Sequence, residues 1–208
     1  MNKRANAQLS LIRDYIDIEG STIVDLGCGF GNFLSAIKGY CNKSYGLEYD
    51  DLAIKHCKQQ ELDVRKIHDE SEIANIDPCK LVVLSHVLEH LRSIDTTLES
   101  LKSSSEYVFI EIPSYNRSIA EQYVDQEGHL NFFTKKSASM LFDKLGFEII
   151  HLDSYGPNIK LFWKENWFFN IIKRQFRSAS KDFFMNKYHS KSNNGIWIRS
   201  ILKVKSNH

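Results

Sequence analysis

The sequence predicts an α/β fold in which helices cover both faces of a doubly wound parallel sheet. Strand-like and helix-like segments alternate over residues 22–152, which is the pattern of such a sheet. The first predicted strand ends at three alternate glycines, Gly27, Gly29 and Gly31, and a helical pattern follows them. Residues 80–85 form a continuous apolar run, as expected of a strand that is buried on both faces.

The predicted elements follow the chain in order. An N-terminal helix at residues 3–18 has apolar residues at helical spacing, and Asp50 or Asp51 caps the third helix. Thr134 caps a later helix, which ends at Gly146. The predicted strands are 22–26, 44–48, 63–67, 80–85, 107–112, 147–152 and 196–204, and the other helices are 31–38, 51–59, 94–102 and 134–145.

Composition predicts one globular domain in a reducing compartment. The 208 residues are 42% hydrophobic, enough for a sizeable core, and a formal net charge of +1 does not favour a nucleic-acid partner. Residues 1–14 lack the apolar stretch of a signal peptide, and no apolar run approaches the roughly 18 residues of a membrane span. The four cysteines show no paired spacing, so we expect a cytoplasmic protein.

The stretch from Asp25 to Gly31 predicts a cofactor site. Glycine accepts positive φ and has no Cβ, so the backbone can turn tightly and lie close to a ligand. A dinucleotide fingerprint reads G-x-G-x-x-G, but here Asn32 stands where its third glycine belongs. Glu48 ends the second strand, where a carboxylate can accept hydrogen bonds from both ribose hydroxyls, and Tyr49 can pack on an adenine.

Four stretches resemble class I methyltransferases that use S-adenosylmethionine (SAM). They are residues 24–31 (VDLGCGFG), 46–48 (GLE), 85–90 (SHVLEH) and 128–134 (GHLNFFT). The resemblance covers residues 20–152 and is strongest for a broad bacterial subgroup whose members often act on small molecules, including sugars and intermediates of cell-surface glycans. It implies a Rossmann-like, seven-stranded, mostly parallel sheet, with the last strand antiparallel beside the sixth.

The resemblance also implies SAM as the cofactor and a set of residues around it. Asp25 would support the glycine turn and the methionine amino end of SAM, and Asp69 stands where relatives carry an acid near the adenine amino group. The predicted SAM-binding residues are Asp25, Gly27, Cys28, Gly29, Gly31, Glu48, Tyr49, Asp69 and Ser85.

Histidines gather where the acceptor would bind. His86, Glu89 and His90 are spaced i, i+3 and i+4, so on a helical turn they share one face, and His129 lies on a separate loop. In one interpretation a histidine removes the proton of an acceptor hydroxyl. In another, Glu89 and His90 merely hold the loop by hydrogen bonds.

A third interpretation is a divalent metal bound by His86, Glu89, His90 and His129. The cluster resembles the E-x-x-E-H motif of ubiquinone-pathway O-methyltransferases and the E-x-x-E-H-H motif, with a distant histidine, of small-RNA 2′-O-methyltransferases. Both groups of enzymes use a metal to hold vicinal hydroxyls. His86 stands where their first glutamate belongs, and Leu91 replaces the second histidine of the RNA enzymes. Loss of a carboxylate disfavours magnesium, and a histidine-rich set suits zinc, manganese or iron. We do not favour this third interpretation from sequence alone.

Residues 157–191 are basic and aromatic. Their helical stripe can lie in a membrane interface, pair with another subunit, pack on the domain itself, or cover the acceptor pocket. We favour a lid whose basic face attracts anionic acceptors such as nucleotide- or lipid-phosphate sugars. The predicted organisation of the single domain 1–208 is an N-terminal helix (1–20), a SAM-binding core (21–152), a helical insertion (153–193) and the last strand (194–208).

The leading prediction is a SAM-dependent methyltransferase acting on a small-molecule hydroxyl of a sugar or glycan precursor. His86, His90 and His129 are the predicted catalytic residues. Two alternatives stay open: a nicotinamide-dependent oxidoreductase, and a non-catalytic module that binds SAM or a partner. The sequence predicts no oligomeric state.

Overall fold

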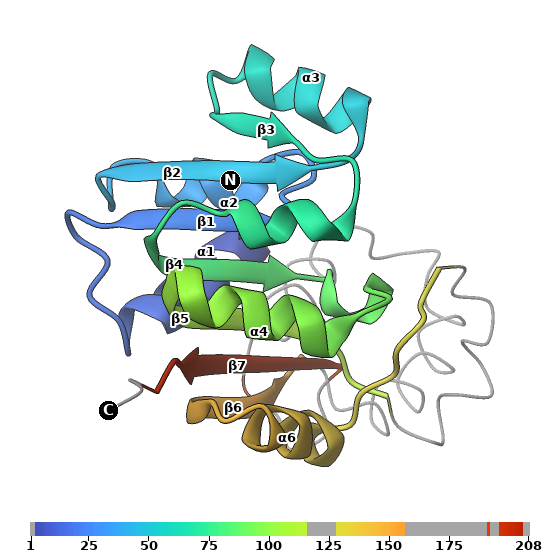
Figure 1. The fold of residues 1–208 in the computed structure, drawn as a ribbon. Helices are drawn as coiled ribbons and strands as arrows, with labels where there is room; N and C mark the ends of the chain where they lie inside the picture. Colours follow the sequence, from blue (N-terminus) through green and yellow to red (C-terminus); the bar gives the residue numbers. More distant parts are fainter. Residues whose placement is uncertain (1–2, 116–127, 157–190, 192–195, 206–208) are drawn as a thin grey trace, which may run out of the picture.

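Seven strands form one sheet in the order β3-β2-β1-β4-β5-β7-β6 (Figure 1). The computed structural model describes residues 3–115, 128–156, 191 and 196–205. The strands are β1 (Thr22–Leu26), β2 (Lys43–Glu48), β3 (Val64–Lys66), β4 (Cys79–Ser85), β5 (Ser105–Pro113), β6 (Glu148–Tyr155) and β7 (Trp197–Lys203). β7 is antiparallel to both of its neighbours, and the other pairs are parallel, which confirms the predicted fold class.

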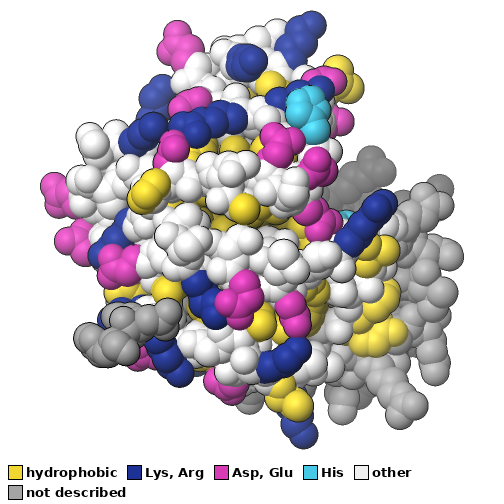
Figure 2. Space-filling model, viewed as in Figure 1, with side chains coloured by type: hydrophobic (Ala, Val, Ile, Leu, Met, Phe, Trp, Pro, Cys, Tyr) yellow, Lys and Arg dark blue, Asp and Glu magenta, His cyan; other side chains and the backbone are white. Residues whose placement is uncertain are grey.

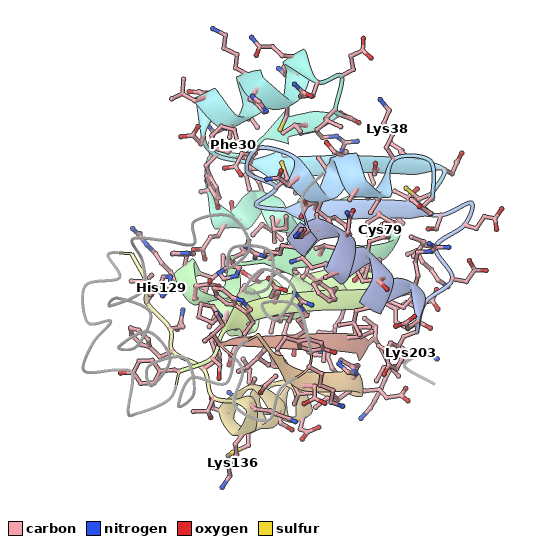
Figure 3. The ribbon with its side chains drawn as sticks, turned by 180° about the vertical axis from the view of Figure 1, so that it is seen from behind. Phe30, Lys38, Cys79, His129, Lys136 and Lys203 are labelled. Carbon is pink, nitrogen blue, oxygen red and sulfur yellow. The ribbon has the colours of Figure 1, made fainter. Side chains whose placement is uncertain are left out.

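Helices cover both faces of this sheet. On one face lie α1 (Lys3–Arg13), α2 (Asn32–Ile37) and α3 (Asp51–Gln59). On the other lie the 3₁₀ helix η1 (Glu70–Asn75), α4 (Ile94–Ser104) and α6 (Lys135–Lys144), as a comparison of Figures 1 and 3 shows. A short 3₁₀ turn, η2 (Leu88–His90), follows β4.

The central strands supply two separate cores. Successive side chains of a strand point to opposite faces, so Leu81 and Val83 pack under α1 and α2, and Val82 and Leu84 pack under α4. All four side chains are fully buried. The continuous apolar run at residues 80–85 therefore has the predicted cause, a strand covered on both faces.

Local caps set the helix boundaries as predicted. Asp50 accepts a hydrogen bond from the N–H of Ala53 at the start of α3. Thr134 and Ser137 form a reciprocal capping box at the start of α6. Both devices satisfy backbone donors that the first helical turn leaves unbonded.

Some predicted boundaries are wrong. The N-terminal helix was expected over residues 3–18 but ends at Arg13. Ile16 and Ile18 are both buried although they are two residues apart, a spacing that extended chain allows and one helical face does not. The sixth strand continues to Tyr155 because β7 provides hydrogen-bonding partners along its whole length.

The carboxyl ends of the parallel strands meet at one edge of the sheet. Figure 3 shows Phe30 and His129 toward this edge, and Cys79 and Lys203 toward the opposite edge. Ligands of open α/β sheets bind outside the carboxyl ends, where the strand order reverses. In this sheet the reversal falls between β1 and β4, beside the predicted glycine turn.

The outer surface carries charges of both signs. Over η1, α4 and α6, basic and acidic side chains are interspersed (Figure 2). Within the described ranges, no helix is both long and apolar enough to cross a bilayer. The predicted basic aromatic insertion at 157–191 lies outside the described residues except for Lys191, and residues 116–127 also lie outside them.

Candidate active site

The glycine turn after β1 has the backbone that the sequence predicts. Gly27, Gly29 and Gly31 have φ values of +68°, +51° and +72°. A methyl group added at Gly27 would come within 2.5 Å of Val87, and one added at Gly31 would overlap Leu62. One added at Gly29 would meet no described atom within 4 Å. The middle of the turn therefore has open space beside the backbone, which fits a ligand.

Glu48 joins the end of β2 to this turn. Its carboxylate accepts hydrogen bonds from the N–H groups of Gly29 (2.6 Å), Tyr49 (2.7 Å) and Asp50 (3.0 Å). A carboxylate has about four lone-pair positions, so it retains capacity for a further donor. The structure thus places Glu48 in the predicted region and shows that it also fixes the turn.

Asp25 lies buried in β1, just before the turn. Burial and, to a smaller extent, the nearby charge of Glu48 raise the pKa of this carboxyl to about 8, against a smaller opposing effect of Arg4. A carboxyl in this state gains most from a cationic ligand. The ammonium group of SAM is such a ligand, so Asp25 fits the predicted role.

Tyr49 and Asp69 lie beyond the ends of β2 and β3. Tyr49 is 42% exposed, and its pKa is raised by burial and by the nearby charges of Glu70 and Asp69. Asp69 is exposed and caps η1 by accepting a hydrogen bond from the N–H of Ser71 (2.8 Å). The two residues predicted to contact adenine therefore lie near each other, at the edge of the sheet where Glu48 ends β2.

Cys28 and Ser85 are held by the protein itself. Burial raises the pKa of the Cys28 thiol, and a side chain at Gly46 would overlap this cysteine. Ser85 Oγ accepts hydrogen bonds from Arg4 Nη2 and Gln8 Nε2, both at 2.7 Å. These contacts fix β4 beneath α1, so both residues support the predicted site from behind.

His86 is not on a helical turn, so the predicted shared helical face is wrong. Its φ is +58°, a left-handed conformation that non-glycine residues seldom adopt, and η2 begins two residues later. Its ring lies between two acids, with Nδ1 3.1 Å from Glu89 and Nε2 3.5 Å from Glu111. Burial lowers the pKa of His86, but the two carboxylates more than offset this, so the pKa is raised.

The structure brings Glu89, His90 and His129 together. One potential ligand atom from each lies within 4.8 Å of the other two. The rings of His90 and His129 meet edge to face with centroids 4.7 Å apart. The backbone oxygen of Glu89 accepts hydrogen bonds from the N–H groups of Leu130 and Asn131, which ties the two segments to each other.

Sequence reasoning missed a buried charge network behind the histidines. Glu111 is fully buried and pairs with Arg199, also buried, and with Arg4 Nε at 2.5 Å. Burial raises the pKa of Glu111, but His86 and the two arginines more than offset this, so the pKa is well below its usual range. The sequence signal that could have revealed this network is a charged residue within each of two apolar strands, Glu111 in one and Arg199 in the other.

Sheet register explains why these charges meet. Glu111 is the pairing partner of Ser85 on one side and of Arg199 on the other. Arg4 reaches the same row from α1. The turn that carries His86 is therefore supported by a row of polar residues across three adjacent strands.

Aromatic side chains lie beside the exposed histidines. Tyr115 and Phe132 have ring centroids 4.9 Å apart, and Phe132 lies 6.4 Å from the ring of His129. Phe132 is 54% exposed and Leu130 56% exposed. Ligand sites typically combine such apolar surface with a few polar groups.

Comparisons with known proteins agree with this geometry. The family model described as a methyltransferase domain matches residues 1–152. A SAM-dependent methyltransferase from Archaeoglobus fulgidus is 20% identical, with a TM-score of 0.66, covering 96% of this chain and 94% of that one. One from Mesorhizobium loti is 12% identical, with a TM-score of 0.63 and coverages of 95% and 97%.

A third solved structure includes a partner protein. A Haloferax volcanii chain in complex with the Trm112 methyltransferase activator is 14% identical, with a TM-score of 0.70, covering 99% of this chain and 91% of that one. At these identities the three structures show the fold. No curated protein sequence matches the chain. The match of the family model to most of the chain, on a sheet of this order and a glycine turn of this shape, shows that it belongs to the class I SAM-dependent methyltransferase family.

Proposed function

We propose that the protein transfers the methyl group of SAM to a hydroxyl of a small-molecule acceptor, a sugar or a precursor of a cell-surface glycan. The observation that carries the proposal is the contact between the two halves of the site. Val87, next to His86, lies so close to Gly27 that a methyl group there would approach it to 2.5 Å. The turn with the histidines therefore adjoins the turn that fits the methyl donor.

On the donor side, the proposal assigns three kinds of contact. The backbone at Gly29 gives SAM close approach, Glu48 accepts hydrogen bonds from its ribose, and Asp25 interacts with its cationic methionine end. Tyr49 and Asp69 contact the adenine. SAM supplies a methyl group already activated by the sulfonium, so the protein's main task is to hold the acceptor oxygen close and in line.

On the acceptor side, His90 and His129 are the groups that meet the acceptor. His90 is exposed and His129 half-buried, whereas His86 lies between Glu89 and Glu111. We therefore assign the acceptor hydroxyl and its proton to His90 and His129, and assign to His86 the positioning of Glu89. Tyr115 and Phe132 offer the apolar surface on which a sugar ring can pack.

The family match leaves the nicotinamide alternative without support, and a non-catalytic module becomes an outcome of the tests. We further propose a cytoplasmic location, supported by four cysteines that are all free thiols. The acceptor class is tested by radiolabelled methyl transfer to a panel of nucleotide sugars, free sugars and lipid-phosphate sugars. SAM binding with no turnover on any member of the panel would contradict this acceptor class.

The donor assignment is tested by Glu48→Ala. Loss of a ribose partner should weaken SAM binding by about 1–3 kcal/mol, roughly 5- to 150-fold in Kd by isothermal titration calorimetry. Glu106→Ala is the matched control, because Glu106 pairs with Lys80 on an exposed surface. A Kd for Glu48→Ala equal to that of the control would remove Glu48 from the SAM site.

A further inference from the structure

We infer that Glu89, His90 and His129 bind a divalent transition-metal ion, with zinc as the best match. The binding of the ion depends on these three residues alone. Its part in the reaction rests on the function proposed above. Three observations support the site: the geometry of the three ligand atoms, the state of the Glu89 carboxylate, and the hydrogen bond of His90.

The three side chains are already near coordination geometry. Their ligand atoms lie within 4.8 Å of one another. A tetrahedral ion that binds nitrogen and oxygen at about 2.0–2.2 Å holds its ligands about 3.3–3.6 Å apart, so each ligand atom has to move inward by about 1 Å at most to complete the site. The hydrogen bonds from Leu130 and Asn131 to the Glu89 backbone keep the two segments in this arrangement.

The buried Glu89 carboxylate has an oxygen left for a cation. The side chain is 1% exposed, and among the described residues neither of its oxygens accepts a hydrogen bond. His86 Nδ1 lies 3.1 Å from Oε1 as an ion-pair partner, and Oε2 has no partner among the described residues. A buried carboxylate without such bonds is costly, and buried charges in proteins are normally paired or bound to metal.

His90 has the hydrogen bond of a metal ligand. Its Nδ1 lies 2.8 Å from the carbonyl oxygen of Gly128. A carbonyl can only accept, so this partner assigns the proton to Nδ1 and leaves the lone pair on Nε2. Metal-binding histidines typically donate their other N–H to a carbonyl or carboxylate in this way.

The types of the three ligands indicate the class of metal. Two imidazoles and one carboxylate form a three-ligand set that is typical of catalytic zinc and leaves a coordination position open. Magnesium prefers oxygen ligands and its own waters. His86 is outside the set, because its ring is placed between Glu89 and Glu111 and against Trp197.

The ion would change how the acceptor hydroxyl is activated. A divalent ion lowers the pKa of an oxygen that binds at its open position. With the ion bound, His90 and His129 would act as its ligands instead of as bases. The bound hydroxyl would lose its proton to water, and its oxygen would take the methyl group of SAM, and SAM would leave as S-adenosylhomocysteine. The exposed position of His90 leaves this side of the site accessible to an acceptor.

The test is metal binding by the full chain, without SAM or acceptor. Protein stripped with a chelator is titrated with Zn²⁺ and Mg²⁺ by calorimetry, and Co²⁺ serves as an absorption probe. We expect one Zn²⁺ per chain, tetrahedral Co²⁺ bands, and much weaker Mg²⁺ binding. His129→Ala and Glu89→Gln should weaken Zn²⁺ binding at least tenfold. His68→Ala is the control, because His68 is exposed on the loop after β3.

Two results would overturn the metal site: no stoichiometric Zn²⁺ binding by the wild type, or unchanged affinity in His129→Ala. Circular dichroism melts confirm that each variant is folded, and His129→Ala keeps the result interpretable if Glu89→Gln is unstable. SAM titrations on the same samples separate the two proposals. SAM binding without Zn²⁺ binding contradicts only the metal site, and Zn²⁺ binding without SAM binding contradicts only the donor site.

Discussion

The donor and acceptor halves of the proposed site are built in different ways. The donor half consists of backbone positions in regular elements: a strand end, a glycine turn and the next strand end at Glu48. The acceptor half consists of side chains from five segments, including α1, the turn after β4, and β7. One half is determined by local chain geometry and the other by long-range charge pairs.

This difference matches the demands of the two ligands. Every member of the family binds the same donor, and a backbone cradle needs only a few glycines and one acid to hold it. The acceptor varies between family members, and side chains on irregular turns can change without disturbing the sheet. A buried charge network beneath those turns then preserves their position while the surface residues differ.

Removing the centre of that network should have the largest effect on the acceptor half. Glu111→Ala takes the carboxylate away from the buried Arg199 and from Arg4. Breaking a buried pair typically costs about 3–5 kcal/mol, so we expect a loss of this size in the free energy of unfolding. Urea denaturation followed by circular dichroism measures it, and Glu111→Gln should lose less because it keeps a hydrogen-bond acceptor.

Glu106→Ala is again the control for this experiment. Its partner Lys80 is on the surface at 2.6 Å, and exposed pairs of this kind contribute about 0–1 kcal/mol. If Glu111→Ala lowers the free energy of unfolding no more than Glu106→Ala does, the acceptor half does not depend on its buried charge network. The proposed difference between the two halves would then be wrong.

Two glycine substitutions should sharpen the contrast in the donor half. Gly31→Ala adds left-handed strain and overlaps Leu62, so we expect a loss of about 2–4 kcal/mol in the free energy of unfolding. Gly29→Ala adds strain alone, about 1–2 kcal/mol, but its methyl group enters the space that we assign to SAM.

The readouts of these two variants should therefore differ. Gly29→Ala should stay folded and bind SAM at least tenfold more weakly by calorimetry. Gly31→Ala should show its defect mainly in urea denaturation. Wild-type SAM affinity in a folded Gly29→Ala variant would show that the open space beside this glycine is not the cofactor's.

The smallest expected effect concerns the buried Asp25 carboxyl of the donor half. Asp25 has a pKa of about 8 in the folded protein, so it is protonated at pH 6. A cationic ligand favours the ionised form, and binding must release this proton. SAM affinity should then increase by about tenfold at most between pH 6 and pH 7, below the range in which an α-amino group titrates. Asp25→Asn should bind weakly with no such dependence.

The raised pKa of Asp25 also predicts how the free energy of unfolding changes with pH in the absence of SAM. The folded state keeps the Asp25 proton up to about pH 8, whereas the unfolded state loses it near pH 4. The contribution of Asp25 to the free energy of unfolding is therefore fully present below pH 4, and it is lost as the pH rises through 8. If the free energy of unfolding changes with pH equally in the wild type and in Asp25→Asn, the raised pKa of Asp25 is contradicted.

Sequence reasoning predicted the donor half closely because local rules determine it. Positive φ at Gly27, Gly29 and Gly31, the cap at Asp50 and the strand end at Glu48 all follow from residue types at fixed spacing. The sheet and its reversed last strand are also confirmed. The roles of these residues toward SAM remain predictions.

The acceptor half was less predictable because its contacts join distant positions. No spacing rule connects Arg4 with Glu111, which are 107 positions apart. Even within one motif, spacing misled: His86 has a left-handed backbone and lies against Glu89, whereas His90 lies against His129. An acid or arginine inside an apolar strand was the available clue, but it does not identify the partner.

The position of β7 has a consequence for how the protein is made. β6 ends at Tyr155, yet its pairing partner within the sheet begins only at Trp197. At roughly 5–20 residues per second, a ribosome needs a few seconds to deliver that partner. Until then β5 and β6 both expose unpaired edges, which are aggregation hazards. When β7 docks, it pairs with β5 on one side and with β6 on the other. The same late event brings Arg199 to Glu111.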